Sequence, residues 1–354
     1  MKTLVRILAA AALMAALLSC KLFDYSNITS KKFALVYGVT AYVSPTDSTY
    51  VANVTNGTSA DPNLSYPDAD AQSLATLLRG EGYTVVARWV DASGKEYLTT
   101  SAGTPVPVGT LSSDASGANG PSKANIPLDI ANYFAGVMGS DDTFLFYFSG
   151  HGTQDTTSSP LHEFFVPEGA VQWDSSQDEY AAYKNDCVRD DEMGGYLNAL
   201  KTPRKIVVLD TCNSGGFIGN QLESDWTPSD SVSGPTFVSP GTLIEAISNY
   251  ADMSSSSTGL SPYGAMVLSA SGRDESSYEW DNWKHGVMTY WLLQGLEGSA
   301  DLNKDGHITA LEAFAYAKSG VDNNWNDTDP VASDGTSAVF EPHVSGGPVD
   351  FVLF

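Results

Sequence analysis

Hydrophobic residues along this chain fall into short runs of strand length, separated by segments with helical spacing or by polar loops. Runs of β-branched and aromatic residues that end at glycine or at a polar residue indicate buried strands. Strands are expected at residues 33–39, 83–89, 144–148, 164–167, 206–209, 265–269 and 349–354. Helices are expected at residues 68–79, 122–138, 190–200, 243–250, 287–296 and 312–317. Because strands and helices alternate, the sequence predicts an α/β fold with a mainly parallel central sheet sandwiched by helices.

Two long stretches between these elements are polar. Residues 91–121 are dense in Gly, Ser, Thr and Pro, which indicates a surface insertion rather than a domain boundary. Residues 219–262 form the second polar stretch, interrupted by the helix expected at 243–250. The 354 residues allow one large domain or two smaller ones, and a hydrophobic content of 42% suffices for a buried core. Since neither stretch marks a boundary, we expect one domain over residues 33–354.

The first twenty residues have the pattern of an export signal. Lys2 and Arg6 form a basic start, and residues 7–18 are an unbroken apolar stretch too short to span a membrane comfortably. The following letters LLSC, which end at Cys20, resemble a bacterial lipobox. This resemblance implies that Cys20 is acylated and becomes the mature N-terminus, followed by a polar tether over residues 21–32. We therefore expect an exported bacterial lipoprotein of the cell envelope, periplasm-facing or surface-exposed and held to the membrane through Cys20; a plain signal peptide cut nearby is the alternative.

The charge of the chain limits its partners. The formal net charge is −24, which argues against nucleic acid as a partner and favours basic ones. Most of the carboxylates are nevertheless expected to be ordinary solvated surface.

Two segments offer a nucleophile and a base at the ends of predicted strands. The segment FLFYFSGHG at residues 144–152 presents His151, and KIVVLDTCNSGGF at residues 205–217 presents Cys212. The carboxyl ends of parallel strands share one edge of a sheet, so the two side chains can meet there. A thiol beside an imidazole suits nucleophilic catalysis, with the thiol assisted toward its thiolate. A disulfide with the remaining cysteine, Cys187, would block this chemistry, so we expect Cys212 to be free.

The sequence SGHG, followed some sixty residues later by D-x-C-x-S-G-G, resembles the caspase and metacaspase superfamily of cysteine peptidases, especially its bacterial caspase-like branch. The resemblance covers roughly residues 32–317 and includes GVTAY at 38–42, PDADAQSLATLL at 67–78 and SASGRDESSYE at 269–279. It implies a caspase-haemoglobinase fold and a cysteine endopeptidase. His151 would take the proton of Cys212 and later protonate the leaving amine. The backbone N–H groups of Gly152 and Cys212 are the candidates for the oxyanion hole.

Acidic residues indicate the substrate. Asp210 stands two residues before Cys212, which in metacaspase-like enzymes is the position that lines the primary specificity pocket. Asp70 resembles the second acidic wall of that pocket, with a helix N-cap as its alternative. Two carboxylates that converge on one cation can offset its desolvation, so the expected substrates are polypeptides with exposed Arg or Lys. The segment that flanks the substrate cleft supplies three further candidates, Ser276, Tyr278 and Glu279.

Two other readings of the same residues stay open. A catalytically silent binding or scaffold lipoprotein could keep the fold, although both catalytic residues are present. An Asp-directed peptidase is the second alternative, but basic pocket residues near Cys212 are missing.

An acidic loop near the C-terminus follows the spacing of a calcium loop. Residues 301–312 place oxygen ligands at positions 1, 3, 5, 9 and 12 and a glycine at position 6. The expected ligands are Asp301, Asn303, Asp305, the carbonyl of His307, Thr309 and Glu312. One such loop can bind calcium weakly or serve only as a tight turn; we expect a structural or regulatory Ca²⁺ and no organic cofactor.

Basic residues are missing from the chain after the nucleophile. From Phe217 to Gly272 there is no Lys or Arg. An enzyme that cuts after basic residues cannot cut itself there, although relatives are often processed in that part of the chain. The sequence therefore predicts a peptidase that works as a single chain, and we expect a monomer.

Overall fold

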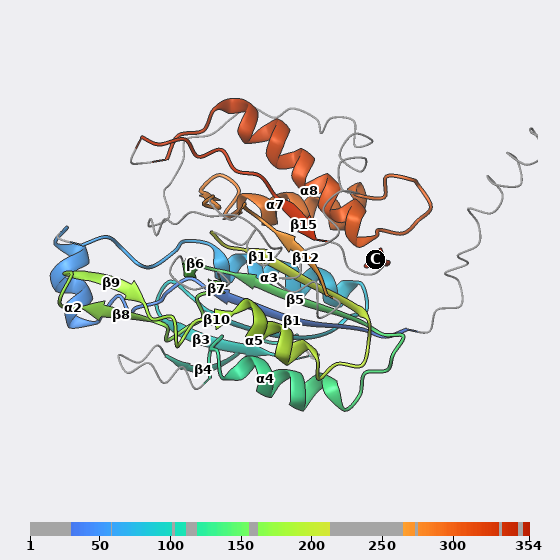
Figure 1. The fold of residues 1–354 in the computed structure, drawn as a ribbon, viewed down its shortest axis with the longest axis horizontal. Coiled ribbons are helices and arrows are strands. Elements are labelled where there is room, and N and C mark those ends of the chain that lie inside the picture. Colours follow the sequence, from blue (N-terminus) through green and yellow to red (C-terminus); the bar gives the residue numbers. More distant parts are fainter. Residues whose placement is uncertain are drawn as a thin grey trace, which may run out of the picture. The chain divides into compact units, whose positions relative to one another are not determined.

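A mainly parallel sheet forms the centre of the computed structural model (Figure 1). Its strands are β1 (Lys32–Val39), β2 (Thr84–Val90), β3 (Lys95–Thr99), β4 (Val106–Thr110), β5 (Thr143–Ser149), β11 (Arg204–Asp210), β12 (Ala265–Ser269) and β15 (His343–Ser345). They lie in the order β15-β12-β11-β5-β1-β2-β3-β4. The five strands from β12 to β2 run parallel. At the two sides, β15 pairs antiparallel with β12, β3 pairs antiparallel with β2, and β4 pairs antiparallel with β3. The predicted mainly parallel sheet is confirmed.

The structure describes residues 30–57, 59–100, 103–110, 119–155, 162–212, 265–272, 275–332, 335–345 and 350–354. All of these residues except Ser30 belong to a compact unit that begins at Lys31. The expected export signal with Cys20, most of the tether and the helix expected at 243–250 lie outside the described residues. Among the residues that are described, none of the helices combines the length and the apolar composition needed to cross a membrane.

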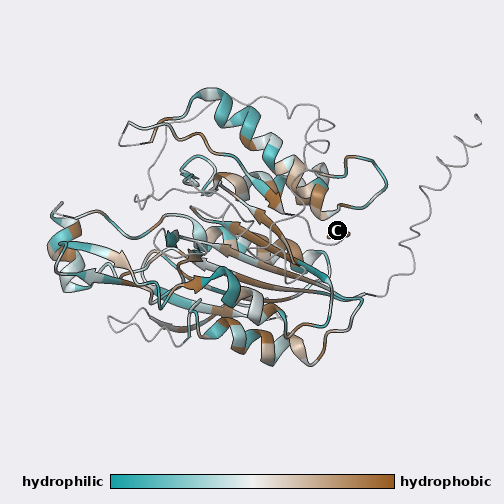
Figure 2. Ribbon diagram, in the orientation of Figure 1, coloured by the Kyte–Doolittle hydropathy of each residue, from teal (hydrophilic) through white to brown (hydrophobic). Residues whose placement is uncertain are grey.

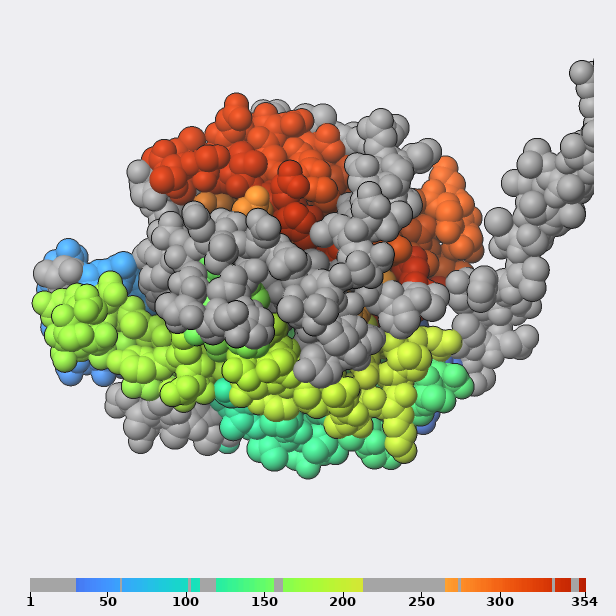
Figure 3. All heavy atoms as spheres, in the orientation of Figure 1, coloured from blue at the N-terminus to red at the C-terminus, as the bar shows by residue number. Residues whose placement is uncertain are grey.

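Helices cover both faces of the sheet. They are α2 (Ser48–Tyr50), η2 (Val51–Thr55), α3 (Pro67–Gly80), α4 (Asn125–Asp129), η3 (Ile130–Ala135), α5 (Asp190–Leu197), α7 (Val287–Gln294), η7 (Gly295–Ser299), α8 (Ala310–Asn324) and η8 (Asn326–Thr328). Apolar side chains of α3, α7 and α8 pack on one face, and those of α4, η3 and α5 pack on the other. In the space-filling view, orange and red C-terminal residues lie on the side where Figure 1 shows α7 and α8 (Figure 3).

Strand β5 shows why this sheet needs cover on both faces. Its alternate residues Phe144, Phe146 and Phe148 join the core under α4 and α5, whereas Leu145 and Tyr147 join the core under α3 and α7. A strand that is buried on both faces is hydrophobic throughout, and Figure 2 shows this as brown colouring along the central strands. The aromatic run that predicted this strand is therefore explained by burial of its alternate residues in two hydrophobic cores, one on each face of the sheet.

Two sequence predictions about the sides of the sheet are wrong. Residues 91–121 contain β3 and β4, which extend the sheet, instead of forming only a surface insertion. Their alternating polar and apolar residues are sufficient for an edge hairpin, and Tyr97 stacks on Trp89 of β2 with ring centroids 5.4 Å apart. At the C-terminus, the strand in the sheet is β15 rather than the one expected at 349–354. Among residues 350–354, Val352 makes an isolated bridge to Thr309.

Short antiparallel ladders complete the fold at the carboxyl edge of the sheet. One joins β6 (Gly152–Asp155), β7 (His162–Phe165) and β10 (Val188–Arg189). Two hairpins pair β8 (Val171–Asp174) with β9 (Glu179–Ala182), and β13 (Glu279–Trp280) with β14 (His285–Gly286). The strand expected at 164–167 corresponds to β7, which begins two residues earlier.

A buried pair of glutamates beside β3 links the stability of the fold to pH. Glu96 and Glu168 are 3% and 4% exposed, and their carboxyl groups share a hydrogen bond. Burial, together with this neighbour, raises the pKa of Glu168 to about 9. Between about pH 4.5 and about pH 9 the native state therefore keeps a proton that the unfolded chain has lost, so the free energy of unfolding falls as pH rises.

We expect the melting temperature to fall between about pH 6 and about pH 9, with on the order of 1.4 kcal/mol lost for each pH unit over which the extra proton is held. Glu168→Gln supplies a permanent N–H donor to Glu96 and should flatten this dependence. Thermal melts across pH measure the effect, with Glu81→Gln as an exposed control that keeps it. An unchanged pH slope in Glu168→Gln would contradict the assignment.

Candidate active site

The register of the sheet brings His151 and Cys212 to the same place. Ser149, the last residue of β5, is paired with Asp210, the last residue of β11. The N–H of Gly150 then donates to the Asp210 carbonyl over 3.2 Å. His151 lies two residues beyond the end of β5, and Cys212 lies two residues beyond the end of β11. A Cβ atom at position 152 would overlap the carbonyl oxygen of Cys212, so only glycine permits the two backbones to approach this closely.

Two neighbours fix the orientation of the His151 imidazole. Its Nε2 lies 2.8 Å from the carbonyl oxygen of Pro62, which can only accept a hydrogen bond, so Nε2 carries the proton. The Nδ1 atom is then the basic nitrogen. The centroid of the Tyr42 ring lies 4.7 Å from the centroid of the imidazole. The Tyr42 hydroxyl accepts a hydrogen bond of 2.7 Å from the His151 backbone N–H. Burial lowers the pKa of His151 to about 4, so the ring is neutral at neutral pH.

Cys212 is partly buried and is held as a thiol. Its Sγ lies 3.8 Å from the carbonyl oxygen of Ser277 and can donate a weak hydrogen bond to it. Burial raises the pKa of the thiol, and the neighbouring hydroxyls of Ser276 and Ser277 oppose this rise. A raised thiol pKa beside a lowered imidazole pKa favours the neutral pair over a thiolate and an imidazolium. Both side chains are therefore neutral in the resting site.

Asp70 and Asp210 converge on one point close to these residues. Both are buried, at 0% and 4% exposure. Both carboxylates approach Gly286, where a Cβ atom would overlap Oδ2 of Asp210 and lie 3.2 Å from Oδ2 of Asp70. Burial and then the charge of Asp70 raise the pKa of Asp210 to about 7. The resemblance implied that these two residues line one pocket, and in the structure both carboxylates approach Gly286.

Donors already surround each of these carboxylates. The Thr289 hydroxyl and backbone N–H donate to Oδ2 of Asp210 over 2.6 and 3.1 Å. The Ser149 hydroxyl donates to Oδ2 of Asp70 over 2.8 Å, and His285 Nδ1 lies 2.7 Å from Oδ1 of Asp70. The side chain of Asp70 does not cap its helix, whose N-terminus at Tyr66 has no side-chain cap. The helix N-cap alternative is therefore wrong.

The three candidates from the cleft-flanking segment have different surroundings. Ser276 lies beside the Cys212 thiol. Glu279 accepts from the backbone N–H groups of Ser65 and Tyr66 over 2.9 and 2.8 Å, which anchors the residues before α3. Burial, with added repulsion from Asp70 and Asp210, raises the pKa of Glu279 to about 8, so this carboxyl group is mostly protonated at neutral pH.

Tyr278 belongs to an aromatic cluster near the end of α8. Its ring is stacked 6.1 Å from that of Trp325 and lies 5.9 Å from that of Phe340. Its hydroxyl donates to the Ser337 carbonyl over 3.5 Å. These contacts support the segment that carries Ser276, and the substrate contact expected for Tyr278 stays a prediction.

Several residues of the site were not predicted from the sequence. Tyr42 lies in the quoted GVTAY motif, but nothing in the motif indicates that its hydroxyl reaches His151. Pro62 acts through its carbonyl group, which no side-chain pattern reveals. Thr289 and His285 lie on either side of the first residue of α7. The only sequence feature that could have drawn attention to His285 is the glycine that follows it.

The predicted calcium loop is folded around its own carboxylates. The backbone N–H groups of Asp305 and Gly306 donate to Asp301 over 3.1 and 3.0 Å, and Asn303 accepts from Asp305 over 2.8 Å. Gly306 has a φ of +88°, in the left-handed region that favours glycine. Glu312 accepts from the Thr309 N–H over 3.0 Å as part of the capping box of α8. The donor set consists of oxygen atoms, as Ca²⁺ prefers, so these residues fit the ion chemically.

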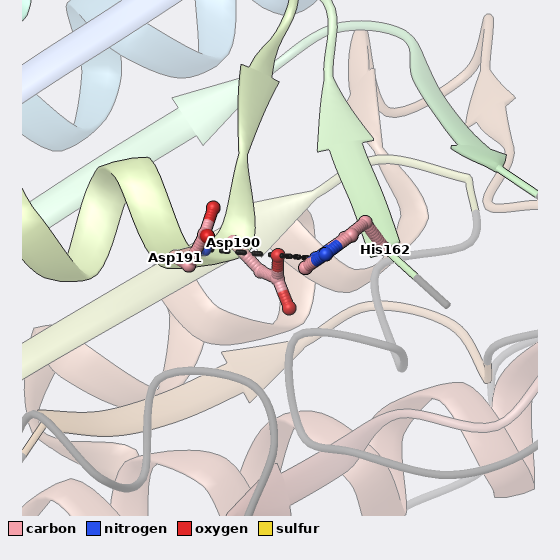
Figure 4. Close-up of side chains that lie close together, drawn as sticks. All are labelled: His162, Asp190 and Asp191. Atoms are coloured by element: carbon pink, nitrogen blue, oxygen red, sulfur yellow. Dashed lines mark hydrogen bonds and ion pairs between the residues drawn. The ribbon is translucent and has the colours of Figure 1, made fainter. Parts of the chain in front are cut away.

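A second group of metal-binding residue types lies on β7 and α5. One ligand atom from each of His162, Asp190 and Asp191 falls within 4.8 Å of the others (Figure 4). Each carboxylate has a basic partner: His162 Nδ1 lies 2.7 Å from Asp190, and Arg189 pairs with Asp191. Both carboxylates are thus already engaged with these partners, so we assign no metal to this group.

Comparison with protein families agrees with this geometry. The family model described as the caspase domain matches residues 31–327. The chain belongs to the caspase domain family. This caspase domain has the predicted caspase-haemoglobinase fold, and its family comprises cysteine peptidases. Histidine and cysteine at two adjoining strand ends are thus placed in a fold known for thiol chemistry.

Individual relatives of this caspase domain are distant. No curated protein matches its sequence. Among solved structures, a protein from Geobacter sulfurreducens shares 16% identity, with a TM-score of 0.44, 90% of this chain covered and 95% of that one. A secreted C11 cysteine protease from Bacteroides thetaiotaomicron shares 10% identity, with a TM-score of 0.26, over 53% of this chain and 48% of its own.

Proposed function

We propose that this caspase domain is a cysteine endopeptidase that hydrolyses peptide bonds after Arg or Lys. The observation that supports this specificity is the convergence of Asp70 and Asp210 on Gly286, next to the edge that carries Cys212 and His151. Two buried carboxylates with mutual repulsion gain most from a ligand that brings a positive charge. A guanidinium or ammonium group meets that requirement.

The proposed reaction divides hydrolysis into two steps on Cys212. The thiol proton moves to Nδ1 of His151 as Sγ attacks the scissile carbonyl carbon, and backbone N–H groups of Gly152 and Cys212 receive the developing oxyanion. The His151 proton then passes to the leaving amine as the C–N bond breaks, which leaves a thioester. A water molecule next gives a proton to His151 and attacks the thioester carbon, and the thiolate leaves and recovers that proton. The Pro62 carbonyl holds the ring in one tautomer throughout.

Reporter peptides that differ only in the residue before the scissile bond test this proposal. We expect turnover of the Arg and Lys peptides under reducing conditions, at rates at least about a hundredfold above those of an Asp peptide, because the pocket would place two carboxylates against a third. Turnover of the Asp peptide alone would favour the Asp-directed alternative. The absence of turnover with every peptide would favour the scaffold alternative.

The protein is proposed to act as an uncut monomer attached to the bacterial cell envelope. The missing Lys and Arg residues between Phe217 and Gly272 support a single chain. The LLSC sequence ending at Cys20 supports a lipid anchor, which metabolic labelling with a fatty acid analogue would detect in the wild type and not in Cys20→Ala.

Ca²⁺ is proposed to stabilise the loop at residues 301–312, where it would cross-link the ligand oxygens. Ile308 in this loop is bound to the C-terminal residues, donating to the Phe354 carbonyl over 2.9 Å and accepting from Leu353 over 2.7 Å. Ordering the loop would therefore also order the last residues of the chain.

We expect saturating Ca²⁺ to raise the melting temperature of the wild type by about 4–8 °C, since ligand at about a hundred times its Kd adds about 2.7 kcal/mol. Glu312→Gln keeps an acceptor for the helix cap but loses the charge, so it should lose most of this rise. Mg²⁺ serves as the ion control and Glu297→Gln, on η7, as the neighbouring variant control. An equal rise in Glu312→Gln would refute calcium binding by this loop.

A further inference from the structure

His285 lies inside the proposed specificity pocket, although the reaction described above gives it no role. It stands on β14 at the start of α7, with its Nδ1 atom 2.7 Å from Oδ1 of Asp70. Its side chain is 17% exposed and Asp70 is fully buried. The same carboxylate that is proposed to attract the substrate cation is therefore in contact with a group that can itself become a cation.

The remaining acceptor positions of Asp70 are largely occupied. The N–H of Gly286 lies 3.2 and 3.3 Å from its two oxygens, and the Ser149 hydroxyl donates to Oδ2. A carboxylate has about four lone-pair sites, so with His285 in place few positions are left for a substrate. Asp70 can therefore act on an incoming cation mainly through its charge. That charge is cancelled when His285 is protonated and is fully expressed when His285 is neutral.

We propose that His285 is a specificity-determining residue whose protonation weakens, and whose deprotonation restores, the affinity of the pocket for Arg and Lys side chains. This inference rests on the proposed basic specificity. A neutral His285 still donates its Nδ1 proton to Asp70, so the geometry of the pocket is kept while its net negative charge grows by one. By linkage, a bound guanidinium makes protonation of His285 less favourable by the same factor.

Other charged groups near His285 also contribute to a pH dependence. Glu279 is paired with the neighbouring Gly286 in the β13–β14 ladder, and His285 itself is paired with Trp280. Asp70 lies on α3, Tyr66 directly precedes that helix, and Tyr290 is the titratable residue of α7. Lys284 precedes it and donates to the Tyr66 hydroxyl over 2.9 Å. Oδ2 of Asp210 also approaches Gly286. Because Asp210 and Glu279 titrate near neutral pH and act in the same direction, the experiment must isolate the contribution of His285.

The test uses the full chain with Cys212→Ala, so that binding is measured without turnover. The probe is Nα-acetyl-arginine amide, and isothermal titration calorimetry measures its binding from about pH 5.5 to about pH 8. His285→Asn keeps an N–H donor at the Nδ1 position but cannot become charged. At about pH 5.5 we expect this variant to bind the probe about tenfold more tightly than its parent, and at about pH 8 the two should agree within about twofold. A gain of affinity cannot arise from damage to the fold.

Two controls accompany this measurement. His162→Asn removes another imidazole that lies 2.7 Å from an aspartate, outside the pocket, and should leave the parental pH dependence unchanged. The neutral isostere Nα-acetyl-citrulline amide should bind weakly and without change between these pH values. If His285→Asn binds the arginine probe no more tightly than its parent at about pH 5.5, the role of His285 is overturned while the basic specificity stands. If the probe binds none of the variants at any pH, the basic specificity itself fails.

Discussion

Replacing Cys212 with alanine is expected to abolish hydrolysis of every reporter peptide that the wild-type protein cuts. The loss in kcat should be about 10⁴–10⁶-fold, because the covalent route disappears together with the sulfur. The imidazole of His151 keeps its contacts with Pro62 and Tyr42, so the melting temperature should change little. Initial rates with the Arg peptide and thermal melts measure the two quantities.

Cys187 provides the matched control for this variant. It is fully buried, and burial raises the pKa of its thiol to about 12, so it is chemically inert at neutral pH. Cys187→Ala should keep activity within about twofold while losing about 1 kcal/mol of stability from the small cavity. Equal losses in the two cysteine variants would show that the effect is structural.

The wild type and Cys212→Ala together also test the proposal that the protein works as a single chain. After incubation, intact-mass measurement should show that neither the wild type nor Cys212→Ala is cut between Ile218 and Ser271. A cut within this range that occurs only in the wild type would overturn either the specificity for basic residues or the single-chain state.

The parallel strands at the centre of the fold could be predicted because each one is a recognisable hydrophobic run in the sequence. Runs such as residues 144–148 are buried on both faces, so every position is hydrophobic and the run stands out from its neighbours. Strands β3 and β4 lack this signal, since an edge strand tolerates polar residues and is stabilised by its partner. Trp89 and Tyr97 form such a cross-strand contact, which becomes visible only once the pairing is known.

The residues of the candidate site also fall into those that the sequence pattern could predict and those that it could not. His151 and Cys212 were predicted because each follows a buried strand, and the parallel sheet then requires their strand ends to share an edge. Pro62, Tyr42 and His285 come from loops or a short hairpin, and their places depend on how those segments pack. A carbonyl group that fixes a tautomer, or an imidazole that contacts a buried carboxylate, has no counterpart in residue spacing.

Asp210→Asn should remove the preference for basic residues while leaving the catalytic pair in place. We expect kcat/KM for the Arg peptide to fall by about 10²–10³-fold, mostly through KM, because a buried partner of the substrate cation loses its charge. Since the pKa of Asp210 is about 7, kcat/KM of the wild type should rise as pH increases through neutrality and the carboxylate ionises. The variant should lose this component of the rise.

Thr289→Val separates the charge of Asp210 from its position. Thr289 donates to Asp210 over 2.6 Å and also lies 2.6 Å from the Tyr147 hydroxyl, so valine preserves the shape but removes both contacts. The pKa of Asp210 should then rise, because the lost donor favoured its charged form, and the pH dependence should move to higher pH with activity largely restored there. Asp210→Asn, in contrast, should stay impaired at every pH. If both variants behave alike, Asp210 acts through the packing of the pocket, and its charge does not select the substrate.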